Sequence, residues 1–273
     1  STFSWKGRRM LVWIVRDISE RQRIDKLKHS LALAKDIQQH LLPRQPPQIK
    51  KLDIHVRQLY CEDIGGDYYD FLHHDDQTEG ILEFMVGDIA GHGIGRALLM
   101  AMAKGVLRNE VVHHHTAPED IFNTLNRSLV KDTDDAMFMT MFYGRIDINT
   151  YSLTWNSAGH GPVFWYRSHL KQIEELPTTN IPLGIFADAI SGSAQSIQLA
   201  PGDILLVGTD GLWETRNVHD QMFGIQRLRQ ILASWADRSS TEITDAIFTK
   251  ITRFCPDDRP EDDLTAMVIK ITE

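Results

Sequence analysis

The sequence predicts an α+β fold built on antiparallel sheets that are covered on both faces. Several strand-like segments are apolar at nearly every position rather than at alternate positions, which indicates that both of their faces are buried. Consecutive strand-like segments are joined by short turns, as in residues 144–155, which favours antiparallel hairpins over repeated parallel units. With 273 residues, 42% apolar and 24% charged, the chain is long enough to bury such a core.

The N-terminal part is predicted to form a strand, a helix and a linker. The apolar run Met10–Arg16 is typical of a strand, and no partner strand is predicted beside it. Asp17 or Ser19 can cap a helix that continues to Leu42. The proline-rich segment 43–47 (PRQPP) then ends that helix and predicts a linker.

The predicted helix carries a 3-4-3-4-3 spacing typical of a coiled-coil seam. The seam positions are Ile24, Leu27, Leu31, Ala34, Gln38 and Leu41. They span only about two and a half heptads, fewer than the usual three or four. An amphipathic helix that packs on its own domain therefore stays an open alternative.

Strands and helices are mixed from Leu52 onward. The predicted strands are 81–88, 138–147, 152–156, 163–166, 204–208 and 264–271. The predicted helices are 95–112, 118–130, 223–236 and 241–254. Strands of this kind, apolar on both faces and separated by helices, belong in a sheet with helices packed against it.

The charge distribution excludes some partners. Residues 1–51 carry 12 basic and 4 acidic side chains, whereas residues 52–273 carry 17 basic and 33 acidic ones. Because an acidic domain repels nucleic acid, we expect no nucleic-acid partner. No stretch approaches the roughly 20 apolar residues of a membrane helix, so no membrane segment is expected. Cys61 and Cys255 have no metal-ligand spacing, which favours a cytoplasmic protein without a zinc site.

Four aspartate-containing turns lie at the ends of apolar segments. Asp88 and Asp210 directly follow such segments, Asp262 lies just before one, and Asp67 follows two glycines. Carboxylates near a dry interior must be paired or bind a cation, and none of the four motifs contains Lys or Arg. Hard oxygen ligands favour Mg²⁺ or Mn²⁺, and a pair of such ions can activate water and clamp a phosphoryl group. A surface turn is the alternative for any single motif.

In this order the motifs resemble those of the metal-dependent PPM Ser/Thr protein phosphatases, in particular the bacterial stage-II-sporulation-E and sigma-B-regulator branch. The segments that carry the resemblance are GGDYYDF (65–71), GDIAGHGIGRALLMA (87–101), MFMTMFYGRID (137–147), NSAGHGP (156–162), IPLGI (181–185), LAPGDILLVGTDGLWE (199–214) and DDLTAMVI (262–269). The resemblance covers about residues 30–272. It implies an α-β-β-α sandwich of two antiparallel sheets flanked by helices.

The resemblance also implies a site for two Mn²⁺ or Mg²⁺ ions. Asp88 would bridge both ions, assisted by the carbonyl group of Ile89. Asp210 and Asp262 would hold one ion, and Asp67 would reach the second mostly through water. Asp88 and Asp210 are the predicted catalytic residues, because a hydroxide that bridges the ions would attack phosphorus without a covalent intermediate.

Three further features of the site stay open. Asp263 occupies the neighbouring acidic or amide position and is a weaker candidate ligand. No residue matches the phosphate-binding arginine of the eukaryotic protein phosphatase 2C-like members. His92 lies in a glycine-rich turn near Asp88 and is a candidate general acid, with a turn or helix-cap role as the alternative.

The N-terminal segment resembles a signalling connector. VRDISERQR (15–23) resembles the end of a PAS sensor domain passing into its output helix, and LAKDIQQHLLP (33–43) resembles the helix that leads into this phosphatase branch. We therefore expect a PAS-like remnant over 1–17, a dimerising linker helix over 18–47 and a phosphatase domain over 48–273. Since the chain begins with Ser rather than Met, we expect it to be a fragment of a longer protein.

Two functions of different classes follow from the resemblance. The first is a protein serine/threonine phosphatase that acts on a phosphorylated partner of the anti-anti-sigma-factor type under control of an upstream sensor domain. The alternative is a catalytically inactive PPM-fold module for signalling and partner binding. The presence of Asp67, Asp88, Asp210 and Asp262 favours the enzyme.

Overall fold

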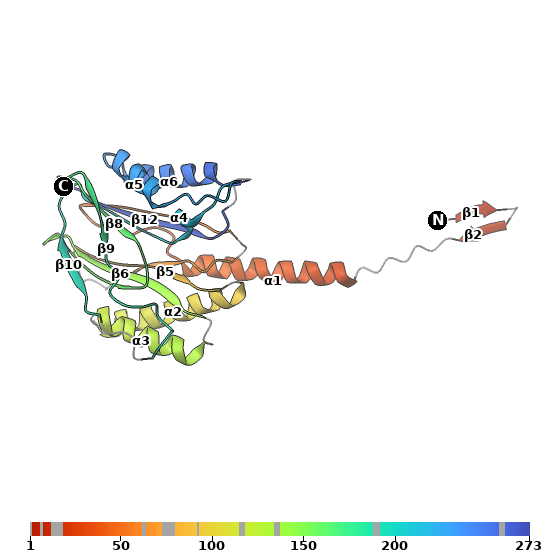
Figure 1. Cartoon of the computed structure of the whole chain (residues 1–273). Coiled ribbons are helices and arrows are strands. Elements are labelled where there is room, and N and C mark those ends of the chain that lie inside the picture. The colour runs from red at the N-terminus through yellow and green to blue at the C-terminus, as the bar shows by residue number, and fades with distance from the viewer. Residues whose placement is uncertain are drawn as a thin grey trace.

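Two five-stranded antiparallel sheets are stacked face to face, and helices cover both outer faces, as the computed structural model shows (Figure 1). This arrangement confirms the predicted α-β-β-α sandwich. The structure describes residues 2–5, 8–11, 19–61, 64–72, 80–91, 93–114, 118–133, 137–187, 192–256 and 260–273.

The first sheet has the strand order β10-β7-β6-β5-β4. Its strands are β4 (Tyr68–Leu72), β5 (Ile81–Ile89), β6 (Met139–Asp147), β7 (Ser152–Ala158) and β10 (Gln195–Gln198). Two helices cover its outer face, namely α2 (Ile94–His114) and α3 (Pro118–Asp132). In the ladder between β5 and β6, Asp88 lies opposite Thr140.

The second sheet has the order β3-β12-β11-β8-β9. Its strands are β3 (Leu52–Leu59), β8 (Val163–Arg167), β9 (Gln172–Leu176), β11 (Ile204–Gly208) and β12 (Leu264–Ile271). Its outer face is covered by α5 (Ile225–Ser234) and α6 (Ser240–Phe254), and the short helix α4 (Gly211–Glu214) follows β11. Ser239 and Glu242 form a reciprocal capping box that fixes the start of α6.

The central strands are apolar at successive positions because each side faces a different hydrophobic core. In β5, Phe84 and Val86 pack between the two sheets, whereas Met85 and Ile89 pack against the helices of the first sheet. Successive side chains of a strand point to opposite faces, so both sets are buried. This packing explains why the doubly apolar segments were recognisable as strands from the sequence.

The N-terminal part contains a hairpin and a long helix. Strands β1 (Thr2–Trp5) and β2 (Arg8–Leu11) pair in an antiparallel manner, so the expectation that the first predicted strand has no partner nearby is wrong. The predicted strand Met10–Arg16 overlaps β2 at its start, and its residues 12–16 lie outside the described residues. Helix α1 (Ser19–Leu41) agrees with the predicted helix, and its N-terminal part extends beyond the sandwich (Figure 1). Across the described part of the chain, no helix is both long and apolar enough to span a membrane.

Candidate metal centre

The four predicted aspartates are contributed by both sheets and meet at one edge of the sandwich. Asp67 directly precedes β4 and Asp88 lies near the end of β5, both in the first sheet. Asp210 follows β11 and Asp262 lies just before β12, both in the second sheet. Burial, together with Asp210 and Asp262, raises the pKa of Asp88 to about 7. The negative charges are thus close enough to disfavour one another's ionised form.

Asp67 is buried and connects the two sheets. Its Oδ2 atom accepts hydrogen bonds from the hydroxyl groups of Thr209 at 2.7 Å and Thr265 at 2.5 Å. Burial, followed by the charges of Asp88 and Asp263, raises the pKa of Asp67 well above its ordinary value. The two hydroxyl groups oppose that shift, since they stabilise the carboxylate. Both threonines adjoin recognised acidic motifs, but their role depends on contacts that the sequence does not reveal.

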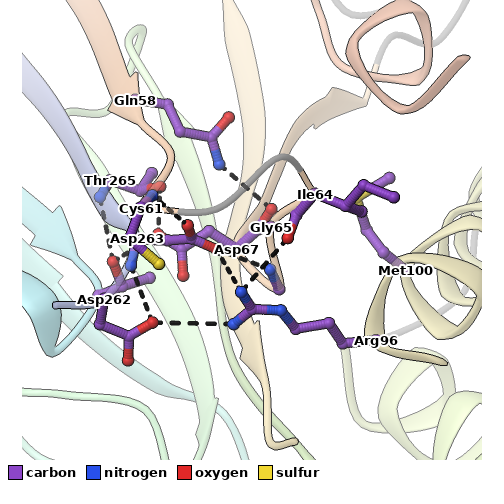
Figure 2. Close-up of polar contacts among 12 residues, drawn as sticks. Gln58, Cys61, Ile64, Gly65, Asp67, Arg96, Met100, Asp262, Asp263 and Thr265 are labelled. Atoms are coloured by element: carbon purple, nitrogen blue, oxygen red, sulfur yellow. Dashed lines mark hydrogen bonds and ion pairs between the residues drawn. The ribbon is translucent and has the colours of Figure 1, made fainter. Parts of the chain in front are cut away.

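Asp263 holds the loop between β3 and β4 against the start of β12. Its Oδ1 accepts from the backbone N–H of Cys61 at 2.9 Å, and its Oδ2 accepts from the N–H of Gly66 at 2.8 Å. The carboxylate is buried, and Figure 2 shows it facing this loop. Asp263 therefore supports the position of Asp67, a role that differs from that of a simple alternative ligand.

Gly66 is required by the close approach of the loop to β5. A Cβ atom at this position would lie 2.9 Å from the carbonyl oxygen of Ile89 and 3.1 Å from an Asp88 carboxylate oxygen. The absence of a side chain therefore allows the segment before Asp67 to lie against the predicted bridging residue. The carbonyl oxygen of Ile89, a predicted ligand, and a carboxylate oxygen of Asp88 therefore both face the position of Gly66.

Asp210 is the N-cap residue of α4, and its side chain makes no cap hydrogen bond. Burial and the neighbouring charges of Asp262 and Glu214 raise its pKa. The backbone N–H groups of Gly211 and of Asp210 itself oppose that rise, because they stabilise the carboxylate. His92, the candidate general acid, lies outside the described residues.

Arg96 extends from the first turn of α2 toward the aspartates (Figure 2). Its side chain is buried, and its guanidinium nitrogens lie 3.8 Å from Asp262 Oδ1 and 3.6 Å from Asp263 Oδ2. It also donates to the carbonyl oxygen of Ile64 at 3.3 Å. The sequence identified Arg96 only as a flanking charge, because nothing in its spacing shows that α2 directs it to residues more than 160 positions away.

The thiol of Cys61 lies near the same group. One potential ligand atom from each of Cys61, Asp262 and Asp263 falls within 4.8 Å of the others. The sequence spacing of the cysteines does not reveal this proximity, because Asp262 and Asp263 are about 200 positions away from Cys61. Burial and the charge of Asp263 raise the pKa of the thiol to about 11, which makes it a poor metal ligand at neutral pH.

Gln38 connects α1 to the acidic centre. Its side chain is buried, and its Nε2 donates to the carbonyl oxygen of Gly65 at 2.7 Å, while its Oε1 accepts from the Gly65 N–H at 3.1 Å. Nε2 also contacts Met100 Sδ of α2 at 3.5 Å. A polar residue in the predicted seam was visible from the sequence, but its partners were not.

Comparisons with known proteins identify the family of the chain. The family model described as Stage II sporulation protein E (SpoIIE) matches residues 78–272. The chain belongs to the SpoIIE family. As a member of the SpoIIE family, it is a Ser/Thr phosphatase of the PPM type. Phosphatases of this type are metal-dependent.

Individual curated proteins and solved structures are also similar to the chain. Phosphoserine phosphatase RsbU of Bacillus subtilis (strain 168) is 27% identical over 244 residues, which are 89% of this chain and 70% of RsbU. The chain covers 41% and 46% of two further curated relatives. The SiaA-PP2C domain of Pseudomonas aeruginosa has a similar fold, with a TM-score of 0.76 at 21% identity over 94% of this chain and all of that domain. RsbX, solved in complex with magnesium, aligns with a TM-score of 0.61 at 19% identity, covering 84% of this chain and 99% of RsbX.

Proposed function

We propose that the chain hydrolyses phosphoserine or phosphothreonine on a regulatory partner protein of the anti-anti-sigma-factor type. The observation that carries the proposal is the convergence of Asp88, Asp210 and Asp262 from two sheets, where burial and the charges of the other two carboxylates raise the pKa of Asp88 to about 7. A purely structural cluster would pair each carboxylate with a hydrogen-bond donor or a cation. The described residues place one cation, Arg96, beside Asp262, and the carboxylates of Asp88, Asp210 and Asp262 still repel one another, as expected of a site that takes up divalent cations.

The chemistry of the donor set fits hard divalent ions. The carboxylates of Asp88, Asp210 and Asp262 would hold the ions together with the carbonyl oxygen of Ile89. Asp67 would reach the second ion mostly through water. Carboxylate and carbonyl oxygens are the ligands that Mg²⁺ and Mn²⁺ prefer. We propose two ions, because five carboxylate groups and a single arginine leave several negative charges uncompensated.

The roles of the protein groups follow from their positions. When bound, the ions supply positive charge for the phosphoryl oxygens and activate a water molecule for in-line attack. Asp88, from the first sheet, and Asp210, from the second, would hold the ions at fixed positions between the two sheets. Asp263 and the hydroxyl groups of Thr209 and Thr265 keep the loop of Asp67 in place.

A hydrolysis assay with paired variants tests this proposal. We expect the chain to hydrolyse p-nitrophenyl phosphate and a phosphorylated anti-anti-sigma-type protein only when Mn²⁺ or Mg²⁺ is added. Asp88→Asn and Asp210→Asn should each reduce the rate at least about 100-fold, which is the scale of losing a major electrostatic group. Asp220→Asn, in an exposed turn, is the matched control and should retain the wild-type rate.

The alternative function gives a different result in the same assay. If the wild-type chain and both variants bind the phosphorylated partner but never release phosphate, the chain is a non-catalytic binding module. If phosphate is released from both substrates at equal rates by the wild type and Asp88→Asn, the proposed site is wrong.

We also propose that the linker helix α1 forms a homodimer and transmits the state of an upstream PAS sensor domain to the acidic centre. Ile24, Leu33 and Ile37 expose apolar surface on α1, whereas the seam position Gln38 is bonded to the loop of the metal centre. Exposed apolar side chains on a long helix support association with a second helix. The bonds of Gln38 supply a direct route from the helix to the loop before Asp67.

Light scattering tests the dimer. We expect a dimer at high micromolar concentration, and we expect the double variant Leu33→Glu, Ile37→Glu to be a monomer. Leu170→Glu, which changes an exposed leucine in a turn, should leave the dimer intact. A wild-type monomer at that concentration would contradict the proposal.

A further inference from the structure

Arg96 is the one cation that the described part of the chain places among the proposed ligands. It is 6% exposed, and its guanidinium group lies between Asp262 and Asp263 (Figure 2). We infer that Arg96 is a built-in counter-cation that partly neutralises the acidic centre before metal is loaded, and thereby lowers the affinity of that centre for divalent ions. The inference rests on the proposed metal-dependent function.

The distances indicate that Arg96 is shared between two carboxylates. Its nitrogens lie 3.8 Å and 3.6 Å from the nearest oxygens of Asp262 and Asp263, whereas a charge-assisted hydrogen bond of an arginine is about 2.7–2.9 Å long. In the same helix, Lys104 Nζ contacts Asp70 Oδ2 at 2.7 Å. Arg96 thus contributes charge to both carboxylates without forming a short, exclusive pair with either.

The carboxylates of Asp262 and Asp263 differ in how readily they can bind a cation from solvent. Asp263 is buried and already accepts hydrogen bonds from the backbone of Cys61 and Gly66. The side chain of Asp262 is 54% exposed, and its Oδ1 accepts a hydrogen bond from the backbone N–H of Asp263 at 2.8 Å. A cation that arrives from solvent therefore meets Asp262 first, and there it competes with the guanidinium group of Arg96.

The position of Arg96 is fixed by the rest of α2. The ion pair between Lys104 and the fully buried Asp70 anchors the helix on β4, about two turns beyond Arg96. Because the side chain extends from this anchored helix, its guanidinium group cannot leave the acidic centre without a change of rotamer or a shift of α2. The electrostatic competition is therefore a property of the folded chain.

Removing the charge should tighten metal binding. We expect Arg96→Gln to lower the dissociation constant for Mn²⁺ about tenfold, since a charge that lies 3.8 Å from a ligand carboxylate is only partly screened at the protein surface. Arg96→Lys should lower it about threefold, because a single ammonium group replaces a fork that reaches both carboxylates. Arg127→Gln, which removes the same charge from an exposed position of α3, should change it less than twofold.

Isothermal titration of manganese chloride into the metal-free full chain measures these constants, and circular dichroism checks that each variant is folded. Thermal unfolding gives a second readout, because the metal-free Arg96→Gln variant should unfold at a lower temperature than the wild type and recover most of the difference in saturating Mn²⁺. If Arg96→Gln is unfolded, Arg96→Lys decides the question by the same titration.

Unchanged or weaker Mn²⁺ binding by a folded Arg96 variant would overturn the inference. In that case the guanidinium group serves to organise the ligands. If the wild-type chain binds neither Mn²⁺ nor Mg²⁺, the proposed function fails as well. If the wild type binds the metal and releases phosphate while the variants bind as it does, only the inference about Arg96 is wrong.

Discussion

The side-chain amide of Gln38 forms two hydrogen bonds with the backbone of Gly65, donating to its carbonyl oxygen at 2.7 Å and accepting from its N–H at 3.1 Å. Both bonds are buried, so neither backbone group has easy access to water. Gly65 lies two residues before Asp67. The end of α1 is therefore fixed to the acidic loop by a specific polar contact, in addition to apolar packing.

Gln38→Leu should leave both backbone groups of Gly65 without these partners. Each buried unsatisfied group costs about 1–3 kcal/mol, so we expect the unfolding temperature to fall by several degrees and Mn²⁺ affinity to decrease. Differential scanning calorimetry and titration with Mn²⁺ measure the two effects. Gln39→Leu, at an exposed neighbouring position, is the control and should change neither quantity. Equal stability of the two variants would contradict the role of Gln38.

Thr265→Val removes one of the two hydroxyl groups that bond Asp67 Oδ2. We expect this nearly isosteric change to lower the free energy of unfolding by about 1–3 kcal/mol, because the buried carboxylate loses a donor. Thr265→Ser keeps the hydroxyl group and should retain most of the stability and the Mn²⁺ affinity. Denaturant unfolding of the metal-free protein tests this pair. If serine and valine are equally destabilising, the methyl group of Thr265 matters more than its hydrogen bond.

Asp88→Asn should change how stability depends on pH. A carboxyl group whose pKa is higher in the folded than in the unfolded chain favours folding at low pH, and this contribution is lost as the pH rises through the folded value. For Asp88 the window extends from its ordinary pKa of 3.8 to about 7. Without metal, the variant should be similar to the wild type near pH 4 and more stable above pH 7.

Thermal unfolding across this pH range measures the difference between the two proteins. Saturating Mn²⁺ should reverse the order at pH 8, because the wild type gains more binding free energy than the variant. Asp220→Asn is the control and should follow the wild type at each pH. A constant difference between Asp88→Asn and the wild type from pH 4 to pH 8 would contradict the raised pKa.

Lys104→Met should destabilise the contact between α2 and β4. Asp70 is fully buried and accepts from Lys104 at 2.7 Å and from the Tyr68 hydroxyl at 3.2 Å. Removal of one partner of a buried ion pair typically costs about 3–5 kcal/mol. Because Arg108 Nε still lies 3.7 Å from Asp70 Oδ2, we expect a loss near the lower end of that range. Chemical denaturation measures the loss. Combining Lys104→Met with Asp70→Asn should recover part of it, and strictly additive losses would contradict the pairing.

The strands that were predictable from the sequence are those whose two faces are both buried. β5, β6, β11 and β12 lie inside their sheets and read as continuous apolar segments. The edge strands β9 and β10 were missed because their side chains are largely exposed and polar. β4 was missed because Asp70 interrupts its apolar pattern, and only the fold supplies Lys104 as its partner.

The acidic residues of the site were predictable, whereas the groups that support them were not. Each aspartate lies at the end of an apolar segment, which is a local signal. Gln38, Arg96 and Thr265 act on residues that are 27, more than 160 and 198 positions away, respectively. Such contacts arise only when the two sheets and the two helices α1 and α2 are assembled.

The acidic centre lies across the boundary between two sheets, and this position has a consequence for mutagenesis. Asp67 and Asp88 are carried by one sheet. Asp210, Asp262 and Asp263 are carried by the other. The spacing of their oxygens therefore depends on the packing of Phe84, Val207 and Met267 between the sheets. Substitutions at such interior positions would appear in a genetic screen as altered demand for metal, although none of the substituted side chains comes from a proposed ligand.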